Sequence, residues 1–340
     1  MIKLGVTDRR GLARPTTLLG RRRHVSLLLL EDLASAEDVS PQLYDSLVGL
    51  MPMPSGVWKL TWRGRMATLD AMVLDLLRDR FGRGTALSVN DVAASTGITS
   101  VEFLRALKAA FTVELVASDL YRDVIAVEGP GRPRLAVVFD ERGRAVQYVW
   151  GRLVLPAGID ESAAYPVNRL LRRWIRRRVE PRARAALART DVGSLAAFGP
   201  VETDGHRVVR LPMLAYEALR AIRDDPGFRF EIWDVLQPLP RRAHVVRAMN
   251  ILTADHLAAS ERERALRHCV EAVLPGGLFV VGWNPMASPD AVRASVYEVQ
   301  GDRLSLLAVL NGGSDVDDDV ARLYHVVDAL ESRAIARGTR

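Results

Sequence analysis

The segment Leu87–Leu107 constrains the fold of this chain more than any other part of the sequence. A short apolar strand pattern runs into the small-residue turn Asp91–Gly97, and a helical pattern follows at once. Small side chains let a ligand approach the backbone, and a helix N-terminus directs free N–H groups toward it. A second strand pattern ends at Asp119, 22 residues after Gly97. This order predicts a nucleotide-type site in which the carboxylate accepts hydrogen bonds from ribose hydroxyls.

Two simpler interpretations of the same residues stay open. A strand, a turn and a helix serve only to pack the fold in many α/β proteins. Asp119 also suits a helix N-cap or a surface salt bridge. The turn and the acid occurring together, in this order, favour the ligand-binding interpretation.

Length and composition describe a globular chain. Its 340 residues, 49% hydrophobic and 26% charged, suffice for one large domain or a domain with an elaboration. The longest apolar run near the N-terminus, Val25–Leu30, has six residues, whereas a membrane span needs about 20. No signal-like apolar segment with a small-residue cleavage site follows the basic residues there. The single cysteine, Cys269, excludes an intrachain disulfide and fits a small buried hydrophobe, so we expect a cytoplasmic location.

The apolar pattern predicts helices alternating with strands. Helical spacing covers Met66–Arg80, strands are expected at 86–92 and 113–118, and Thr99 or Ser100 suits the N-cap of the helix between them. After an interruption the pattern resumes with a helix at Met213–Asp224, strands at Arg229–Trp233 and His244–Ala248, a helix at Ser260–Val273 and a strand at Leu278–Trp283. Such alternation favours an α/β fold with a doubly wound, mostly parallel sheet covered on both faces.

The interruption and the C-terminus have patterns of their own. Leu135–Phe139 and Val146–Leu155 predict a β-hairpin, and an arginine-rich helix that ends at Pro181 follows. Near the C-terminus, Ala294–Val299 and Leu304–Leu310 predict a second hairpin, which would form an antiparallel edge. A closing helix is expected over Val316–Ala336.

These patterns divide the chain into four expected segments. Residues 1–65, punctuated by prolines, form an N-terminal extension lying on the main domain. Residues 66–128 and 201–340 form the two halves of that domain, and 129–200 form a basic insertion between them.

Five stretches of the chain together resemble a known family. They are DVAASTG (Asp91–Gly97), Asp119, Asp234, AHVVRAMNILTADHL (Ala243–Leu257) and AVLPGGLFVVG (Ala272–Gly282). In this order they resemble the class I S-adenosylmethionine-dependent methyltransferases, and the Pro-Gly-Gly turn is the most specific match. The nearest resemblance is to chemotaxis-receptor-type methyltransferases, which have a similar Asn-x-Leu stretch, a similar Leu-Pro-Gly-Gly run and a similar terminal hairpin.

The resemblance implies a fold, a cofactor and a set of site residues. The fold is a Rossmann-like doubly wound sheet with an antiparallel C-terminal hairpin edge and an inserted β-hairpin and basic helix. The function implied is that of a transferase that moves a methyl group in line from S-adenosyl-L-methionine to an acceptor that the sequence does not identify. The implied cofactor-binding residues are Asp91, Ala93, Ala94, Ser95, Gly97, Asp119, Leu120, Asp234, Val235 and Asn250. The candidates at the reacting end are Asn250, Thr253, Asp255 and His256, because ligands of open α/β sheets bind beyond the carboxyl ends of the strands.

The first motif departs from the family pattern. The family has Gly-x-Gly-x-Gly where this chain has Ala93, Ser95 and Gly97. Two added side chains narrow the space over the backbone, although both are small and the Ser95 hydroxyl is able to bond to a ligand. A degenerate motif of this kind is compatible with an active enzyme and with a member that has lost activity.

The arginine-rich segment supports a second hypothesis. Residues Val167–Arg189 contain nine arginines and one glutamate, which concentrates the +6 net charge of the chain in one segment. Val167, Leu170, Leu171, Trp174 and Ile175 share one face of the expected helix. Such a helix either packs on the sheet or docks on an anionic partner, a membrane surface or a nucleic acid, through Arg169–Arg189. The alternative function is therefore a non-catalytic methyltransferase-like binding protein. If its anionic partner is a membrane surface, the protein is peripheral to that membrane.

Other enzyme classes fit the sequence less well. The six histidines lack paired ligand spacing and one cysteine builds no zinc site, so no metal is expected. A nicotinamide-dependent dehydrogenase would use Asp119, but the Pro-Gly-Gly turn and the terminal hairpin do not favour it.

Overall fold

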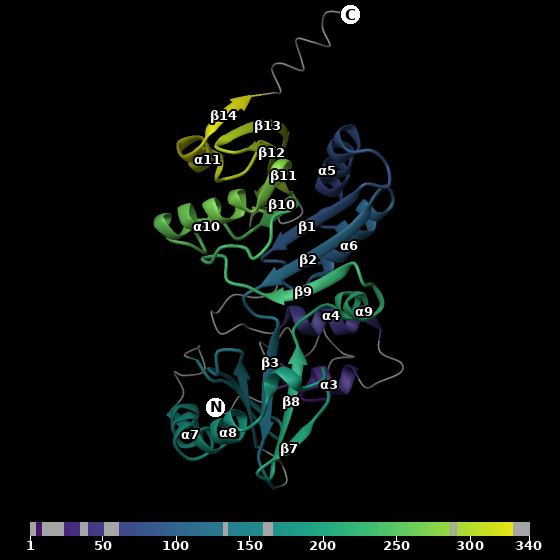
Figure 1. The fold of residues 1–340 in the computed structure, drawn as a ribbon. Helices are drawn as coiled ribbons and strands as arrows, with labels where there is room; N and C mark the ends of the chain where they lie inside the picture. Colours follow the sequence, from purple (N-terminus) through teal and green to yellow (C-terminus); the bar gives the residue numbers. More distant parts are fainter. Residues whose placement is uncertain are drawn as a thin grey trace, which may run out of the picture. The chain divides into compact units, whose positions relative to one another are not determined.

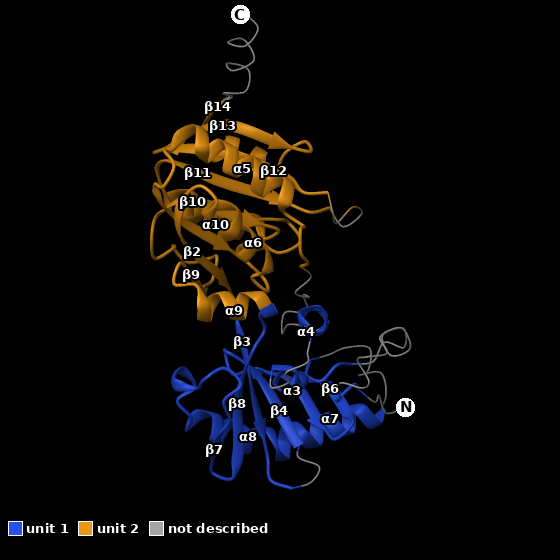
Figure 2. Cartoon of the chain, turned by 90° about the vertical axis from the view of Figure 1, so that its right-hand side faces the viewer, with its two compact units in different colours: residues 1–60, 121–216 blue, residues 61–120, 217–340 orange. Residues whose placement is uncertain are grey.

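The computed structural model describes residues 5–8, 24–34, 40–50, 61–131, 135–158, 166–285, 288 and 291–328. The chain forms two compact units, coloured separately in Figure 2. Unit 1 contains residues 1–60 and 121–216, and unit 2 contains residues 61–120 and 217–340. The expected insertion, 129–200, lies inside the second segment of unit 1.

Unit 2 is built on one eight-stranded sheet. Its parallel part runs in the order β9 (Phe228–Ile232), β2 (Thr112–Asp119), β1 (Ala86–Val92), β10 (Ala243–Met249) and β11 (Val273–Trp283). Counted within unit 2 this order is 3-2-1-4-5, the order of doubly wound nucleotide-binding sheets. The expected α/β fold with a mostly parallel sheet is confirmed.

The C-terminal strands extend this sheet at one edge. β12 (Arg293–Gln300) pairs antiparallel with β11, and β13 (Arg303–Leu310) pairs antiparallel with β12 around Gly301 and Asp302, as the hairpin pattern predicts. β14 (His325–Asp328) then pairs parallel with β13. The single closing helix expected over Val316–Ala336 is wrong in its described part. Helix α11 (Asp317–Leu323) ends at Leu323, and the β-branched run that follows pairs with β13 instead.

Helices cover both faces of the parallel strands (Figure 1). α5 (Ala67–Arg80) and α6 (Ile98–Lys108) pack on one face, and α10 (Ala259–Glu271) packs on the other. The period of two along β10 explains this division, because Val246 and Ala248 join the apolar cluster under α10 while Arg247 points to α5 and α6. Helix α9 (Tyr216–Asp224) leads into β9.

Cys269 confirms the simpler of its interpretations. It lies on the buried face of α10 in the apolar cluster, and burial raises the pKa of its thiol to about 12. Such a thiol stays protonated at neutral pH and acts as a small apolar side chain.

Unit 1 is a six-stranded antiparallel sheet rather than the single hairpin that the sequence predicts. Its strands are ordered β6 (Leu153–Pro156), β5 (Ala145–Trp150), β4 (Leu135–Asp140), β3 (Asp123–Glu128), β8 (His206–Pro212) and β7 (Val201–Thr203). The expected second arm of the hairpin, Val146–Leu155, is two strands because Gly151 turns the chain with a φ of 52°.

Helices flank the sheet of unit 1. The arginine-rich segment forms α7 (Pro166–Arg178) and α8 (Glu180–Ala188), whose apolar residues share a core with β3, β4, β5, β6 and β8. Pro181 lies in the first turn of α8 and does not end one long helix, because a helix start requires no amide N–H at that position. A short 3₁₀ turn follows at Val192–Ser194.

The N-terminal extension belongs to unit 1 and not to the sheet of unit 2. Gln147 of β5 accepts a hydrogen bond from Leu27 N–H at 2.9 Å and donates one to the Val25 carbonyl at 2.8 Å. These buried bonds fix the segment before α3 (Leu29–Ala34), and α4 (Pro41–Gly49) follows with Ser40 as its N-cap. The described residues just before α3 are therefore held by a buried polar side chain of β5. No helix among the described residues is long and apolar enough to cross a membrane.

Candidate functional site

The turn after β1 keeps a glycine-type backbone without having glycine at every position. Ala93, Ser95 and Gly97 have φ values of 55°, 56° and 78°. These are the three positions of the degenerate motif, and each adopts the left-handed conformation that glycine reaches without strain. The Ala94 N–H donates to the Ser118 carbonyl at 2.8 Å, which ties the turn to the end of β2. All three positions of the turn therefore have the backbone conformation that favours glycine, although two of them are not glycine.

Substituting glycine at these two positions is expected to stabilise unit 2. A left-handed conformation costs a non-glycine residue about 1–2 kcal/mol. Glycine relieves this cost but gains freedom in the unfolded chain, so Ala93→Gly and Ser95→Gly each raise the free energy of unfolding by up to about 1 kcal/mol. For a domain of this size that raises Tm by about 2–4 °C, measurable by calorimetry.

Ala94 provides the matched control for this prediction. It lies between the two positions and is not among the residues with positive φ. Glycine relieves no backbone strain at this position. It increases the freedom of the unfolded chain and removes the contacts of the alanine methyl group, so Ala94→Gly lowers Tm. An equal loss of stability in all three variants would show that the turn is not strained.

Gly97 packs the turn against the rest of unit 2. A Cβ built on Gly97 would lie 3.1 Å from the Ala218 Cβ of α9 and 3.1 Å from the Phe230 ring of β9. This is the role of the third glycine in dinucleotide-binding turns, where the helix approaches the sheet closely. Gly97 is also the N-cap of α6, so the helix begins two or three residues before the expected caps Thr99 and Ser100.

Asp119 joins the turn to two strand ends. One carboxylate oxygen accepts from the Ser95 N–H at 2.8 Å, and the Asp119 carbonyl accepts from the Trp233 N–H at 3.0 Å. The side chain is half-buried at the carboxyl end of β2 and Leu120, also half-buried, follows it. The carboxylate therefore lies against the turn after β1.

Asp234 and Val235 lie in the loop after β9. The Asp234 carboxylate accepts from the Leu236 N–H at 3.0 Å, so it caps its own loop. Val235 packs against the apolar cluster under α10. The pairing of β2 with β9 brings this loop beside Asp119.

The residues after β10 divide into an anchored and an exposed group. Asn250, with a φ of 60°, donates from its side-chain amide to the Asn284 side-chain oxygen at 3.0 Å and accepts from the Asn284 N–H at 2.7 Å. Thr253 is buried, while Asp255 and His256 are exposed in the turn that leads to α10. Sequence analysis did not include Asn284, whose side chain fixes the ends of β10 and β11 together.

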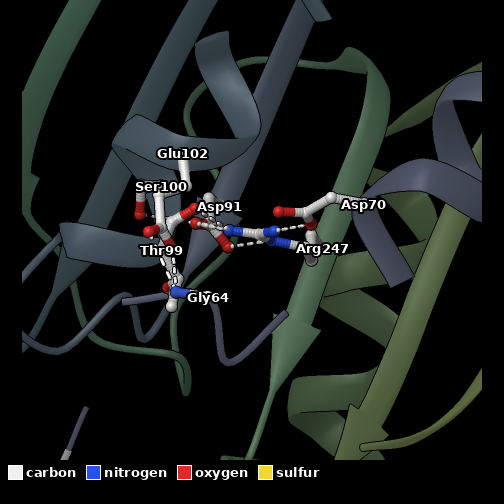
Figure 3. Close-up of polar contacts among 7 residues, drawn as sticks. All are labelled: Gly64, Asp70, Asp91, Thr99, Ser100, Glu102 and Arg247. Carbon is white, nitrogen blue, oxygen red and sulfur yellow. Dashed lines mark hydrogen bonds and ion pairs between the residues drawn. The ribbon is translucent and has the colours of Figure 1, made fainter. Parts of the chain in front are cut away.

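The side chain of Asp91 belongs to a buried cluster of charged residues (Figure 3). Its two oxygens accept from Arg247 at 2.9 and 2.6 Å, and the Ser100 hydroxyl donates to it at 2.5 Å. Arg247 also donates to Asp70 of α5 at 2.6 Å and to the Thr99 carbonyl at 3.2 Å. The guanidinium lies over the Phe103 ring, 4.3 Å from its centroid. Asp91 thus joins α6 to Arg247 of β10, and Arg247 in turn joins α5 through Asp70.

Burial and neighbouring charges shift the pKa values of several groups in and beside this cluster. Arg247 is 1% exposed and faces two carboxylates, so the pKa of its guanidinium is raised by their charges. Burial raises the pKa of Asp70 to about 7, because the loss of solvation outweighs the attraction of Arg247. Glu102 on α6 accepts from the Gly64 N–H at 2.9 Å, and burial raises its pKa as well.

Sequence analysis missed Arg247 and Asp70. The signal was an arginine inside the apolar strand run HVVRAM, since a charge in a buried strand needs a buried partner. Its partners come from segments that only the fold brings together.

The carboxyl ends of β9, β2, β1 and β10 thus form one edge that carries most of the expected site residues. The turn and Asp119 are in direct contact, and the loops with Asp234 and Asn250 follow the neighbouring strands. Among the described residues no group of three or more His, Cys, Asp or Glu side chains is placed to hold a metal ion.

Comparisons with known proteins give structural neighbours only. No protein-family model matches the sequence, and no curated protein is similar to it at a significant level. Among solved structures, the N-methyltransferase NodS from Bradyrhizobium japonicum WM9 in complex with S-adenosyl-l-homocysteine is 10% identical, with a TM-score of 0.28 over 75% of this chain and 71% of that one. SAM-bound CalS10, an amino pentose methyltransferase from Micromonospora echinaspora, is 13% identical, with a TM-score of 0.30 over 77% of this chain and 87% of that one. The PH0226 protein from Pyrococcus horikoshii OT3 is 12% identical, with a TM-score of 0.31 over 77% of this chain and 81% of that one. Such TM-scores are too low to define a fold, which rests here on the chain's own strand order.

Proposed function

We propose that unit 2 is an S-adenosyl-L-methionine-dependent methyltransferase domain that binds its cofactor at the carboxyl edge of β1, β2, β9 and β10. One observation carries the proposal: Ala93, Ser95 and Gly97 all adopt left-handed φ, and Asp119 lies in hydrogen-bond contact with that turn. Keeping a strained conformation at two non-glycine residues has an energetic cost, and such strain concentrates at ligand-binding sites.

The residues at this edge fit an adenosyl cofactor in conformation and in charge. The left-handed turn leads directly into the N-terminus of α6, where Gly97 is the N-cap. Because Gly97 has no side chain to cap the first amide N–H groups of this helix, a bound ligand would be able to accept from them. Asp119 would accept from the ribose hydroxyls while it still holds the Ser95 N–H. Asp234 would accept from the adenine amino group, and Leu120 and Val235 would border the base. Ser95 adds a hydroxyl where the family pattern has bare backbone.

The reaction asks little of the chain beyond alignment. When bound, the cofactor supplies a methyl group activated on a sulfonium. Asn250, held by Asn284, would fix the loop that carries the acceptor side of the site. Thr253 is buried in this loop, and the exposed Asp255 and His256 would be the groups that take a proton from an acceptor.

The acceptor class is left open in this proposal. The likeness to chemotaxis-receptor-type methyltransferases is a resemblance of sequence at the Asn250 loop, at Pro275-Gly276-Gly277 and in the β12–β13 hairpin. It supports the cofactor assignment and names no substrate.

Calorimetric titration of the full chain with S-adenosyl-L-methionine and with its demethylated product tests the proposal. We expect binding with Kd between about 1 µM and 1 mM, the range in which enzymes bind their substrates. NAD⁺, which also carries an adenosyl ribose, is the control ligand and should bind more weakly. No heat of binding at millimolar ligand, with protein shown to be folded by circular dichroism, would contradict the proposal. Tighter binding of NAD⁺ would assign the edge to a dehydrogenase instead.

A further inference from the structure

Helix α7 has an apolar face that is wider than the core of unit 1 covers. Leu171 and Ile175 pack on the sheet, with Ile175 1% exposed. Val167, Leu170 and Trp174 are spaced three and four residues apart, which places them in one strip beside the buried face. The core therefore accounts for only part of the apolar surface of this helix.

The uncovered strip is strongly exposed for apolar side chains. Leu170 is 67% exposed, Val167 49% and Trp174 47%. The Trp150 ring of β5, 41% exposed, stacks on Trp174 with ring centroids 6.3 Å apart and an interplanar angle of 30°. Exposed apolar residues that gather in this way mark an interaction site more often than a solvated surface.

Positive charge surrounds the strip. Helix α7 contains six arginines in 13 residues and no acidic residue. Arg169, Arg173 and Arg177 recur every four residues on the side of the helix next to Leu170, and Arg178 follows on the other side of Trp174. These four side chains are exposed and make no ion pair within the part of the chain that the structure describes. Their charge is therefore available to an external anion.

We propose that this surface, made of Trp150, Val167, Leu170 and Trp174 with Arg169, Arg173, Arg177 and Arg178, docks unit 1 on an anionic phospholipid membrane. Tryptophan prefers the interface between headgroups and hydrocarbon, and arginines beside it meet lipid phosphates. The proposal is independent of the function proposed for unit 2.

The aliphatic residues favour lipid over nucleic acid as the occupant. Nucleic acid offers Leu170 and Val167 little apolar surface beyond thymine methyl groups, whereas hydrocarbon removes both side chains from water. The two tryptophans stack on each other, so each has one ring face already covered and is less open to stacking with a base. Leu170 is the most exposed of the four apolar side chains and projects as a lipid anchor would.

Flotation of the full chain with vesicles tests the surface. Wild-type protein should float with vesicles of phosphatidylcholine containing a third phosphatidylglycerol, and should not float with phosphatidylcholine alone. Raising the salt to molar concentration should release it, because the charge contribution is screened. Arg173→Glu/Arg177→Glu should weaken binding at least tenfold, since each arginine near an anionic surface contributes about a fivefold change in affinity and two are reversed in charge.

A second variant tests the apolar contribution, and two controls match the changes. Leu170→Ser/Trp174→Ser should also lose at least tenfold in binding while its circular dichroism stays that of the wild type, because both side chains are exposed. Arg242→Glu/Arg264→Glu changes the net charge equally at exposed arginines of unit 2, and Ile222→Ser removes an exposed apolar side chain of α9. Both controls should bind as the wild type does.

Three results would overturn the proposal. The first is wild-type protein that binds neither kind of vesicle, or binds both equally. The second is unchanged flotation in both variants of the surface. The third is binding to nucleic acid in place of lipid. If the chain instead shifts short RNA or DNA duplexes in a gel at the same salt while ignoring vesicles, the surface belongs to nucleic acid and the lipid assignment is wrong.

Discussion

Replacing Arg247 by methionine is expected to destabilise unit 2 by about 3–5 kcal/mol, because two carboxylates then remain buried without their cation. Arg247 is 1% exposed and bonds to both Asp70 and Asp91. Methionine fills a similar volume and returns none of these bonds. For a domain of this size the change lowers Tm by about 10 °C, which calorimetry at neutral pH measures.

The pH dependence identifies the cause of this loss. The pKa of Asp70 is about 7 in the fold and 3.8 in the unfolded chain. Between these pH values the folded chain holds a proton that the unfolded chain has lost, so this carboxyl lowers the free energy of unfolding as pH rises through that window and changes it no further above. Removing Arg247 raises the Asp70 pKa still more. The penalty of Arg247→Met should therefore be smaller at pH 5 than at pH 8.

Two variants control this experiment. Asp70→Asn keeps an oxygen that accepts from Arg247, so it should fold with nearly wild-type stability at pH 8 and lose the pH dependence that Asp70 contributes. Arg242→Met removes an exposed arginine and should change stability by less than about 0.5 kcal/mol. An Arg247→Met protein as stable as Arg242→Met would mean that the buried cluster does not hold the helices to the sheet.

Replacing Asp119 by alanine is expected to weaken binding of the adenosyl cofactor at least 100-fold. Two hydrogen bonds from ribose hydroxyls to a charged carboxylate contribute about 1.5–3 kcal/mol each. The substitution also leaves the Ser95 N–H without the acceptor that holds the turn. Titration of the variant with S-adenosyl-L-methionine, beside the wild type, measures the loss.

Asp119→Asn separates these two contributions. The amide oxygen still accepts from the Ser95 N–H, so the turn keeps its conformation while the charge that faces the ribose is lost. We expect affinity between those of the wild type and the alanine variant. Glu114→Ala, an exposed change on the same strand, should bind as the wild type does. Equal cofactor affinity in wild type and Asp119→Ala would remove the ribose role from this residue.

The local elements followed closely from sequence because their causes are local. The short strand patterns of β1 and β2, the helical spacing of α5 and the turn residues at Gly301 and Asp302 each depend on neighbours in the chain. The turn Asp91–Gly97 was recognisable for the same reason. Boundaries that depend on distant partners were missed, as with β14, which is a strand only because β13 lies beside it.

The sequence by itself determined the parallel sheet, the turn after β1 and the carboxylate that follows β2, because strand and helix periods and small-residue turns act within a few residues. Only the tertiary structure decided what the charged side chains do. It paired Asp91 with an arginine 156 positions away, bound the N-terminal segment to unit 1, and left the strip of α7 uncovered. Burial and pairing depend on which segments the fold brings together. The identity of a charged or apolar residue does not by itself show whether it is buried against a partner or exposed to solvent.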